Sequence, residues 1–96
     1  MKKVMEEAIK IASKNTEGIH ISYDLDVIDP QIAMGVSVPA ENGINLEQVK
    51  ESIFEIVKNK KIIKSFDLVE YNPLKDQNDN TLNIAQGIIV ELLKHI

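Results

Sequence analysis

The sequence predicts an α/β protein in which helices and strands alternate in the order α-β-α-β-α. Residues 19–25 and 61–69 are rich in the β-branched and aromatic side chains that favour strands. Between these two runs, residues 46–58 place apolar side chains at helical spacing. A strand, helix, strand unit with parallel strands crosses over right-handed, so both strands point their carboxyl ends in the same direction.

Two further helices are predicted, one at each end of the chain. Residues 2–14 carry apolar side chains at helical spacing, and Asn80 or Thr81 begins the last helix. The apolar stripe of that last helix is regular and comprises Ala85, Ile88, Ile89, Leu92, Leu93 and Ile96. Asn45 and Gln48 stand at the spacing of a capping box that opens the middle helix.

Two loops, residues 27–45 and 71–80, follow the predicted strands. The first is punctuated by prolines and glycines, and a loop of that length in a small domain usually has a function. The chain has 96 residues, which is enough for one small domain.

Composition excludes several classes of protein. The net charge is -4, from 11 basic and 15 acidic residues, which argues against a nucleic-acid partner. No cysteine is present, so disulfides and thiolate chemistry are excluded, as is common for a cytoplasmic protein. Glu6 and Glu7 interrupt any apolar region near the first residue, and no apolar run approaches membrane-spanning length, so neither a signal peptide nor a membrane partner is expected.

Asp24 and Asp26 are the first candidates for a functional site. They lie two residues apart at the end of the first predicted strand, where side chains of that spacing share one face. In open α/β sheets this end of a strand borders the ligand crevice. Two carboxylates there suit a divalent cation, although most such pairs are solvated loop acids or turn caps.

The residues around these acids resemble a signature of the arginase family of ureohydrolases, which includes arginases, agmatinases and formimidoylglutamases. The matching positions are Ser22, Tyr23, Asp24, Leu25, Asp26, Pro30, Gly35 and Gly43. Residues 67–73 resemble the second C-terminal motif of the family and are followed by Asp76 and Thr81. The resemblance implies that residues 1–96 form the C-terminal segment of a parallel three-layer α/β/α arginase-type sheet.

The resemblance implies a function in metal-dependent hydrolysis of linear guanidines or amidines, which in the intact family converts arginine to ornithine and urea. Asp24 would bridge two Mn²⁺ ions and Asp26 would chelate one of them. Glu70 would bind the substrate, because a carboxylate accepts two parallel N–H bonds from a guanidinium. No residue of this segment is assigned a catalytic role.

The histidine-containing metal motifs of the family are missing. The only histidines are His20, which we expect to be packed or hydrogen-bonded, and His95, which we expect to face solvent. The ligand set for Mn²⁺ is therefore incomplete, and we expect the chain to be inactive alone. Two strands also leave sheet edges exposed, which predicts a homo-oligomer. Asp67 is expected to be a structural acid held by backbone or loop donors.

Two other interpretations remain open. The chain could be a non-catalytic truncated relative that acts as a folding, oligomerisation or binding module. Asp24 and Asp26 also resemble the nucleophile motif of haloacid-dehalogenase-type phosphohydrolases, but that interpretation leaves residues 67–73 unexplained. Among ureohydrolases, residues 35–39 and 42–44 look closer to bacterial arginases than to agmatinases.

Overall fold

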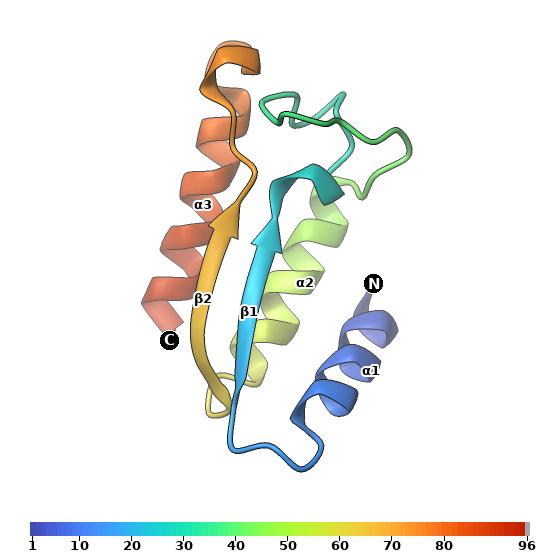
Figure 1. The fold of residues 1–96 in the computed structure, drawn as a ribbon, viewed down its shortest axis with the longest axis vertical. Helices are drawn as coiled ribbons and strands as arrows, with labels where there is room; N and C mark the ends of the chain where they lie inside the picture. The colour runs from blue at the N-terminus through green and yellow to red at the C-terminus, as the bar shows by residue number, and fades with distance from the viewer. Residues whose placement is uncertain (96) are drawn as a thin grey trace.

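The computed structural model describes residues 1–95 and shows the predicted order of elements (Figure 1). Ile96, the last residue of the predicted apolar stripe, lies outside the described residues. The elements are α1 (Lys2–Ser13), β1 (Ile19–Asp24), a short 3₁₀ helix η1 (Leu25–Val27), α2 (Leu46–Lys58), β2 (Ile63–Val69), a second 3₁₀ helix η2 (Pro73–Lys75) and α3 (Asn80–His95).

The two strands form one parallel sheet. Ile19 pairs with Ile63 at one end and Asp24 pairs with Val69 at the other, with a register shift after Ile19. Both carboxyl ends therefore lie at the same end of the sheet, which confirms the predicted α/β class and the parallel crossover.

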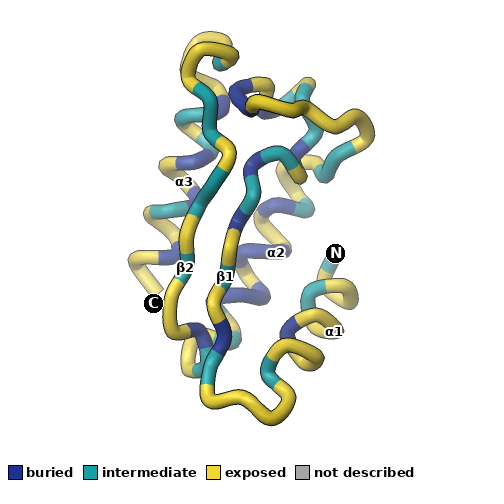
Figure 2. Tube along the Cα trace, viewed as in Figure 1, coloured by how far each residue is buried: buried dark blue, intermediate teal, exposed yellow. Residues whose placement is uncertain are grey.

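The sheet is covered on one face only. In Figure 1, α2 and α3 lie behind the strands, and α1 lies beside α2. Side chains of β1 alternate accordingly, because Ile19 and Tyr23 are buried whereas His20 and Ser22 are exposed (Figure 2). The described residues thus supply two layers of the three-layer arrangement that the family resemblance implies.

The helix α2 connects the sheet to both other helices. Its capping box is present, because Gln48 N donates to Asn45 Oδ1 and Asn45 N donates to Gln48 Oε1, both at 2.9 Å. Its buried face is Val49, Ser52, Ile53, Glu55 and Ile56. The predicted apolar face included Leu46, which is exposed, and omitted both polar residues of the buried face.

One hydrogen-bonded pair joins α2 to the sheet inside the core. The hydroxyl of Ser52 donates to Val49 O at 2.6 Å, and the Tyr23 hydroxyl lies 2.8 Å from Ser52 Oγ. Burial raises the pKa of Tyr23, while the bond to Ser52 acts in the opposite direction. Among residues 1–95, no helix combines the length and the apolar character that crossing a membrane requires.

Candidate functional site

Asp24 and Asp26 lie close together at the carboxyl end of β1, but strand alternation is not the cause. The strand ends at Asp24, and Asp26 belongs to the 3₁₀ turn η1. Asp24 Oδ1 accepts a hydrogen bond from Asp26 N at 2.9 Å and so caps this turn. The prediction that both acids leave one face of a strand was wrong, because the capping carboxylate starts a turn where an extended strand was expected.

Glu70 completes an acidic cluster with Asp24 and Asp26. The pKa of Asp26 is raised, first by its hydrogen bond with the Asp24 side chain, then by partial burial and by the negative charges of Asp24 and Glu70. None of the ion pairs formed within residues 1–95 involves these three acids. The cluster is therefore a concentration of negative charge that a bound cation would stabilise.

The backbone at Glu70 is unusual. Its φ is 72°, in the left-handed region that a residue with a long side chain rarely adopts. This conformation lets the chain leave β2 and place Tyr71 in an antiparallel bridge with Val36. Backbone strain of this kind concentrates at functional sites, which supports a role for Glu70 beyond the sheet.

The loop between η1 and α2 is held against the segment that follows β2. Gly35 N donates to Thr81 Oγ1 at 2.8 Å, and Asn72 N donates to Gly35 O at 2.7 Å. Lys75 Nζ donates to Ser37 O at 2.8 Å. These contacts confirm that the two predicted loops flank the acidic end of the sheet.

Asp76 anchors the start of α3 and was noted from the sequence only as a family match. Its carboxylate accepts backbone hydrogen bonds from Gln77 and Thr81 at 2.9 Å and from Leu82 at 3.0 Å, and one from the Tyr71 hydroxyl at 3.1 Å. Burial alone raises the pKa of Asp76, but these hydrogen bonds outweigh it and hold the pKa at about 2. An acid a few residues before a helical stripe is the signal that points to such an anchor.

We expect the variant Asp76→Asn to have a lower melting temperature, by roughly 5 °C at neutral pH, because an amide has one acceptor oxygen instead of two. The folded pKa of about 2 lies below the ordinary value of 3.8, so the stabilisation is complete above that value and is lost as the pH falls towards 2. The difference between wild type and variant should therefore shrink over that range.

Circular dichroism melts at a series of pH values from neutral to about 2 check the expectation for Asp76. Asp79→Asn, an exposed neighbour, is the control. A melting-temperature difference that stays constant across the series would contradict a role for the Asp76 charge.

The exposed face of the sheet carries a second polar cluster. His20 Nδ1 lies 2.7 Å from Ser65 Oγ, and His20 Nε2 lies 3.1 Å from Asp67 Oδ2. The Ser22 hydroxyl donates to Asp67 Oδ1 at 2.6 Å, and this bond is the main reason that the pKa of Asp67 is lowered, with smaller contributions from His20.

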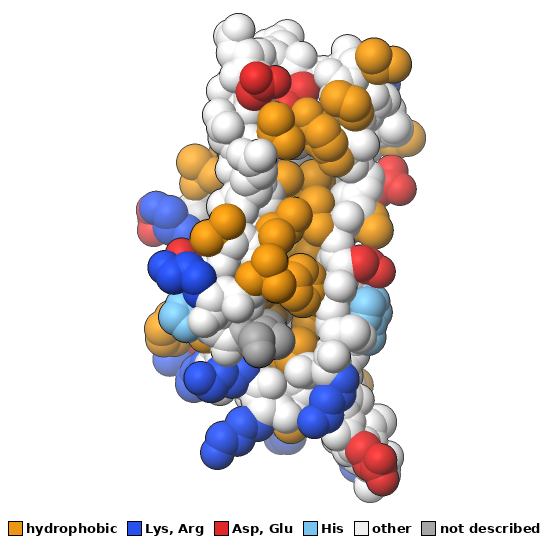
Figure 3. Space-filling view, turned by 90° about the vertical axis from the view of Figure 1, so that its left-hand side faces the viewer, with side chains coloured by type: hydrophobic (Ala, Val, Ile, Leu, Met, Phe, Trp, Pro, Cys, Tyr) orange, Lys and Arg blue, Asp and Glu red, His pale blue; other side chains and the backbone are white. Residues whose placement is uncertain are grey.

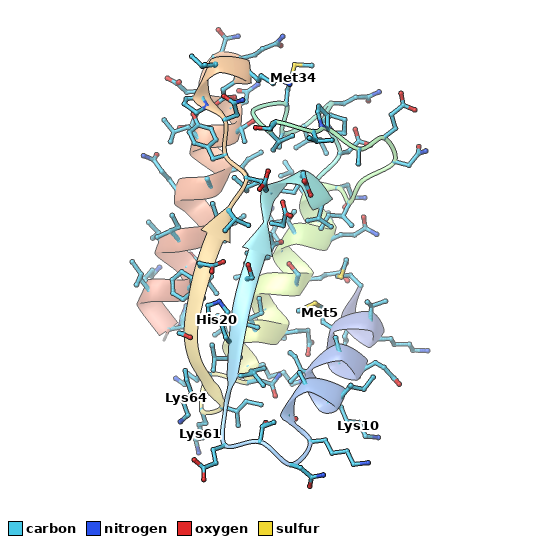
Figure 4. The ribbon with its side chains drawn as sticks, viewed as in Figure 1. Met5, Lys10, His20, Met34, Lys61 and Lys64 are labelled. Atoms are coloured by element: carbon cyan, nitrogen blue, oxygen red, sulfur yellow. The ribbon has the colours of Figure 1, made fainter. Side chains whose placement is uncertain are left out.

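These contacts settle the predictions for the two histidines and Asp67. His20 is hydrogen-bonded, as expected, and Figure 4 places it away from the carboxyl ends of the strands. The donors to Asp67 are side chains of the neighbouring strand, so the prediction of backbone or loop donors was wrong. His95 is exposed, as expected, with Glu91 at 3.6 Å.

The acidic cluster fits part of a manganese site. Its carboxylate oxygens are suitable ligands for Mn²⁺. However, no group of three His, Cys, Asp or Glu side chains within residues 1–95 is arranged to hold a metal ion. Because both His20 ring nitrogens have partners on the sheet face, the cluster has no imidazole ligand from that residue.

A parallel strand, helix, strand unit with acids at its carboxyl ends defines a segment of an open α/β fold of the ligand-binding kind. The arginase family model matches residues 1–94, and the chain belongs to this family. An arginase of Brevibacillus brevis is 39% identical over 89 residues, which are 93% of this chain and 30% of the relative.

Solved structures agree with the family assignment. The arginase of Bacillus caldovelox matches with a TM-score of 0.86 at 33% identity, over 94% of this chain and 30% of that protein. An agmatinase of Bacillus subtilis is 35% identical over 75 residues, which are 78% of this chain and 26% of the relative. The chain therefore spans about 30% of the length of the arginases that it matches.

Proposed function

We propose that this chain supplies the acidic part of the manganese site of an arginase-type ureohydrolase, as the C-terminal segment of that fold. The observation that carries the proposal is the meeting of Asp24, Asp26 and Glu70 at one end of the sheet, where the negative charges of Asp24 and Glu70 help to raise the pKa of Asp26. Residues that repel one another in this way gain stability when a cation binds between them.

Asp24 and Asp26 are the proposed metal ligands. Asp24 would bridge two Mn²⁺ ions and Asp26 would chelate one, as the family resemblance implies. The ions, when bound, lower the pKa of a water molecule so that hydrolysis proceeds at neutral pH. The hydrogen bond from Asp26 N to Asp24 Oδ1 orients the Asp24 carboxylate and leaves its other oxygen without a backbone donor from the turn.

Glu70 is the proposed substrate residue. Its carboxylate would accept two parallel N–H bonds from a guanidinium and hold the substrate carbon at the metal site. The left-handed backbone at Glu70 fixes where its side chain leaves the strand. The reaction is hydrolysis of a linear C–N bond, and we propose arginine, converted to ornithine and urea, because the sequence motifs look closest to bacterial arginases.

The chain alone is proposed to be inactive. Each Mn²⁺ needs more ligands than two acids provide, and imidazole nitrogen helps to select manganese. Incubation of the purified chain with arginine and Mn²⁺ should therefore release no urea above the buffer control. Sustained, metal-dependent release of urea would contradict this expectation.

The metal site is tested by isothermal titration of Mn²⁺ into the chain and into the double variant Asp24→Ala, Asp26→Ala. We expect saturable binding by the wild type and its loss in the variant, because each substitution removes a carboxylate ligand. The double variant Glu6→Ala, Glu7→Ala removes the same charge from the exposed surface of α1 and should bind as the wild type does.

Two outcomes of this titration would count against the metal proposal. Equal binding by all three proteins would show that the ion binds elsewhere. No binding by any of them would favour a second candidate, a non-catalytic relative that serves as a folding or binding module, which the incomplete ligand set within residues 1–95 also favours. The predicted homo-oligomer is tested separately, by light scattering over a range of protein concentrations.

A further inference from the structure

The outer edge of β2 is the largest unfinished feature of the molecule. Within the described residues the sheet has two strands, and β2 pairs only with β1. The other edge of β2 therefore presents backbone N–H and C=O groups that have no partner strand. Such an edge is a template on which another strand can pair.

A band of apolar side chains lies along this edge. Figure 3 views the molecule from the side of β2 and α3 and shows hydrophobic side chains running down its middle. The edge band, as we define it, comprises Phe66, Leu68, Leu82, Ile89 and Leu93. The first four are half-buried and Leu93 is 65% exposed.

The helical spacing of α3 explains why the band continues beyond the strand. Leu82, Ile89 and Leu93 stand seven and then four residues apart, so they share one side of the helix. Ile84, Gly87 and Glu91 line the other side, where α3 faces α2. The edge of β2 is thus bordered by an apolar surface on the side that no element of residues 1–95 covers.

We infer that the edge of β2 and the edge band bind a complementary polypeptide that adds a parallel strand to this sheet and completes the acidic site. Two observations identify this occupant. The related arginases are about three times longer than the matched segment, so about 70% of their fold has no counterpart here. The acidic cluster holds too few ligands, and a parallel strand beside β2 brings its own carboxyl end next to Glu70.

A second copy of this chain fits the same edge less well. Two copies that pair β2 with β2 and keep their helices on one face must run antiparallel. Their acids then lie at opposite ends of the combined sheet, and neither site gains a ligand. The inference extends the proposed function, since both treat the acids as part of a larger site.

The test supplies the missing part in trans. The portion of the Bacillus caldovelox arginase outside the aligned segment is co-expressed with the tagged chain and purified in EDTA, so that assembly is measured without metal. We expect a one-to-one complex by sedimentation. Leu93→Lys should weaken it at least about tenfold, as charge in the centre of an interface does.

A matched variant and a reference partner make the result decisive. Phe54→Lys changes a side chain that is 66% exposed, against 65% for Leu93, on the helix α2 away from the edge. It should leave the complex intact. The aligned segment of the Bacillus caldovelox arginase, supplied as a separate chain, shows that the complementary portion is competent to assemble.

Three results would overturn the inference. The first is a complementary portion that binds its own segment but not this chain. The second is equal weakening by Leu93→Lys and Phe54→Lys. The third is a homodimer of this chain that is lost in Leu93→Lys and excludes the complementary portion. Because no metal is present, a failure of assembly is distinguishable from a failure of the manganese proposal.

Discussion

Replacement of Gly43 by alanine is expected to destabilise the protein by about 2–3 kcal/mol, the upper range for a forced backbone clash. A Cβ atom at this position would lie 2.5 Å from Asp29 N, 2.6 Å from Val27 O and 2.7 Å from the carbonyl carbon of Ile28. All three are backbone atoms, so no side-chain rotation relieves the contact.

The clash would open the base of the loop between η1 and α2. Ile44 N donates to Val27 O at 2.9 Å and Asp29 N donates to Ile44 O at 3.0 Å, and these bonds hold the two ends of the loop together. Val27 is also the last residue of η1, the turn that contains Asp26. The variant should therefore show weaker Mn²⁺ binding as well as lower stability.

Gly87→Ala is the matched control for Gly43→Ala. A Cβ atom at Gly87 meets nothing within 4 Å, and the residue lies inside α3. Alanine is the better helix former, so this variant should be more stable than wild type by roughly 0.5–1 kcal/mol. Urea denaturation of both variants checks the opposite signs, and a Gly43→Ala variant as stable as wild type would contradict the loop closure described here.

The order of elements could be predicted from the sequence because it depends on local patterns. Apolar spacing located three helices, and the Asn45 and Gln48 pair located the start of α2. The end of β1 was harder to locate, because the Asp24 carboxylate bonds to Asp26 N and begins a turn. Hydrophobic periodicity carries no signal for such a side-chain to backbone bond.

The site was predictable in its residues but not in its geometry. The family motifs pointed to Asp24, Asp26 and Glu70, which do share one end of the sheet. The left-handed backbone of Glu70 and the four hydrogen bonds to Asp76 depend on how two distant loops meet. The partners of Asp67 likewise depend on the register between β1 and β2, which the sequence does not specify.

Glu55 shows the same limit and leads to the second large effect. It interrupts the apolar face of α2, yet it is 1% exposed, and neither carboxylate oxygen has a hydrogen-bond partner among the described residues. The nearest cation is Lys58, whose Nζ lies 3.8 Å from Glu55 Oε2, beyond hydrogen-bonding distance. A buried polar group without a partner costs about 1–3 kcal/mol.

We therefore expect Glu55→Leu to raise the free energy of unfolding by roughly 1–3 kcal/mol, because leucine fills a similar volume without a charge to desolvate. Glu51→Leu, one turn earlier on the exposed side of α2, should change it by less than about 0.5 kcal/mol. Urea denaturation at neutral pH measures both. A destabilised Glu55→Leu variant would mean that the carboxylate is satisfied in solution, by water or by a second polypeptide, and the seam between α1 and α2 would then be a polar contact and not a defect in packing.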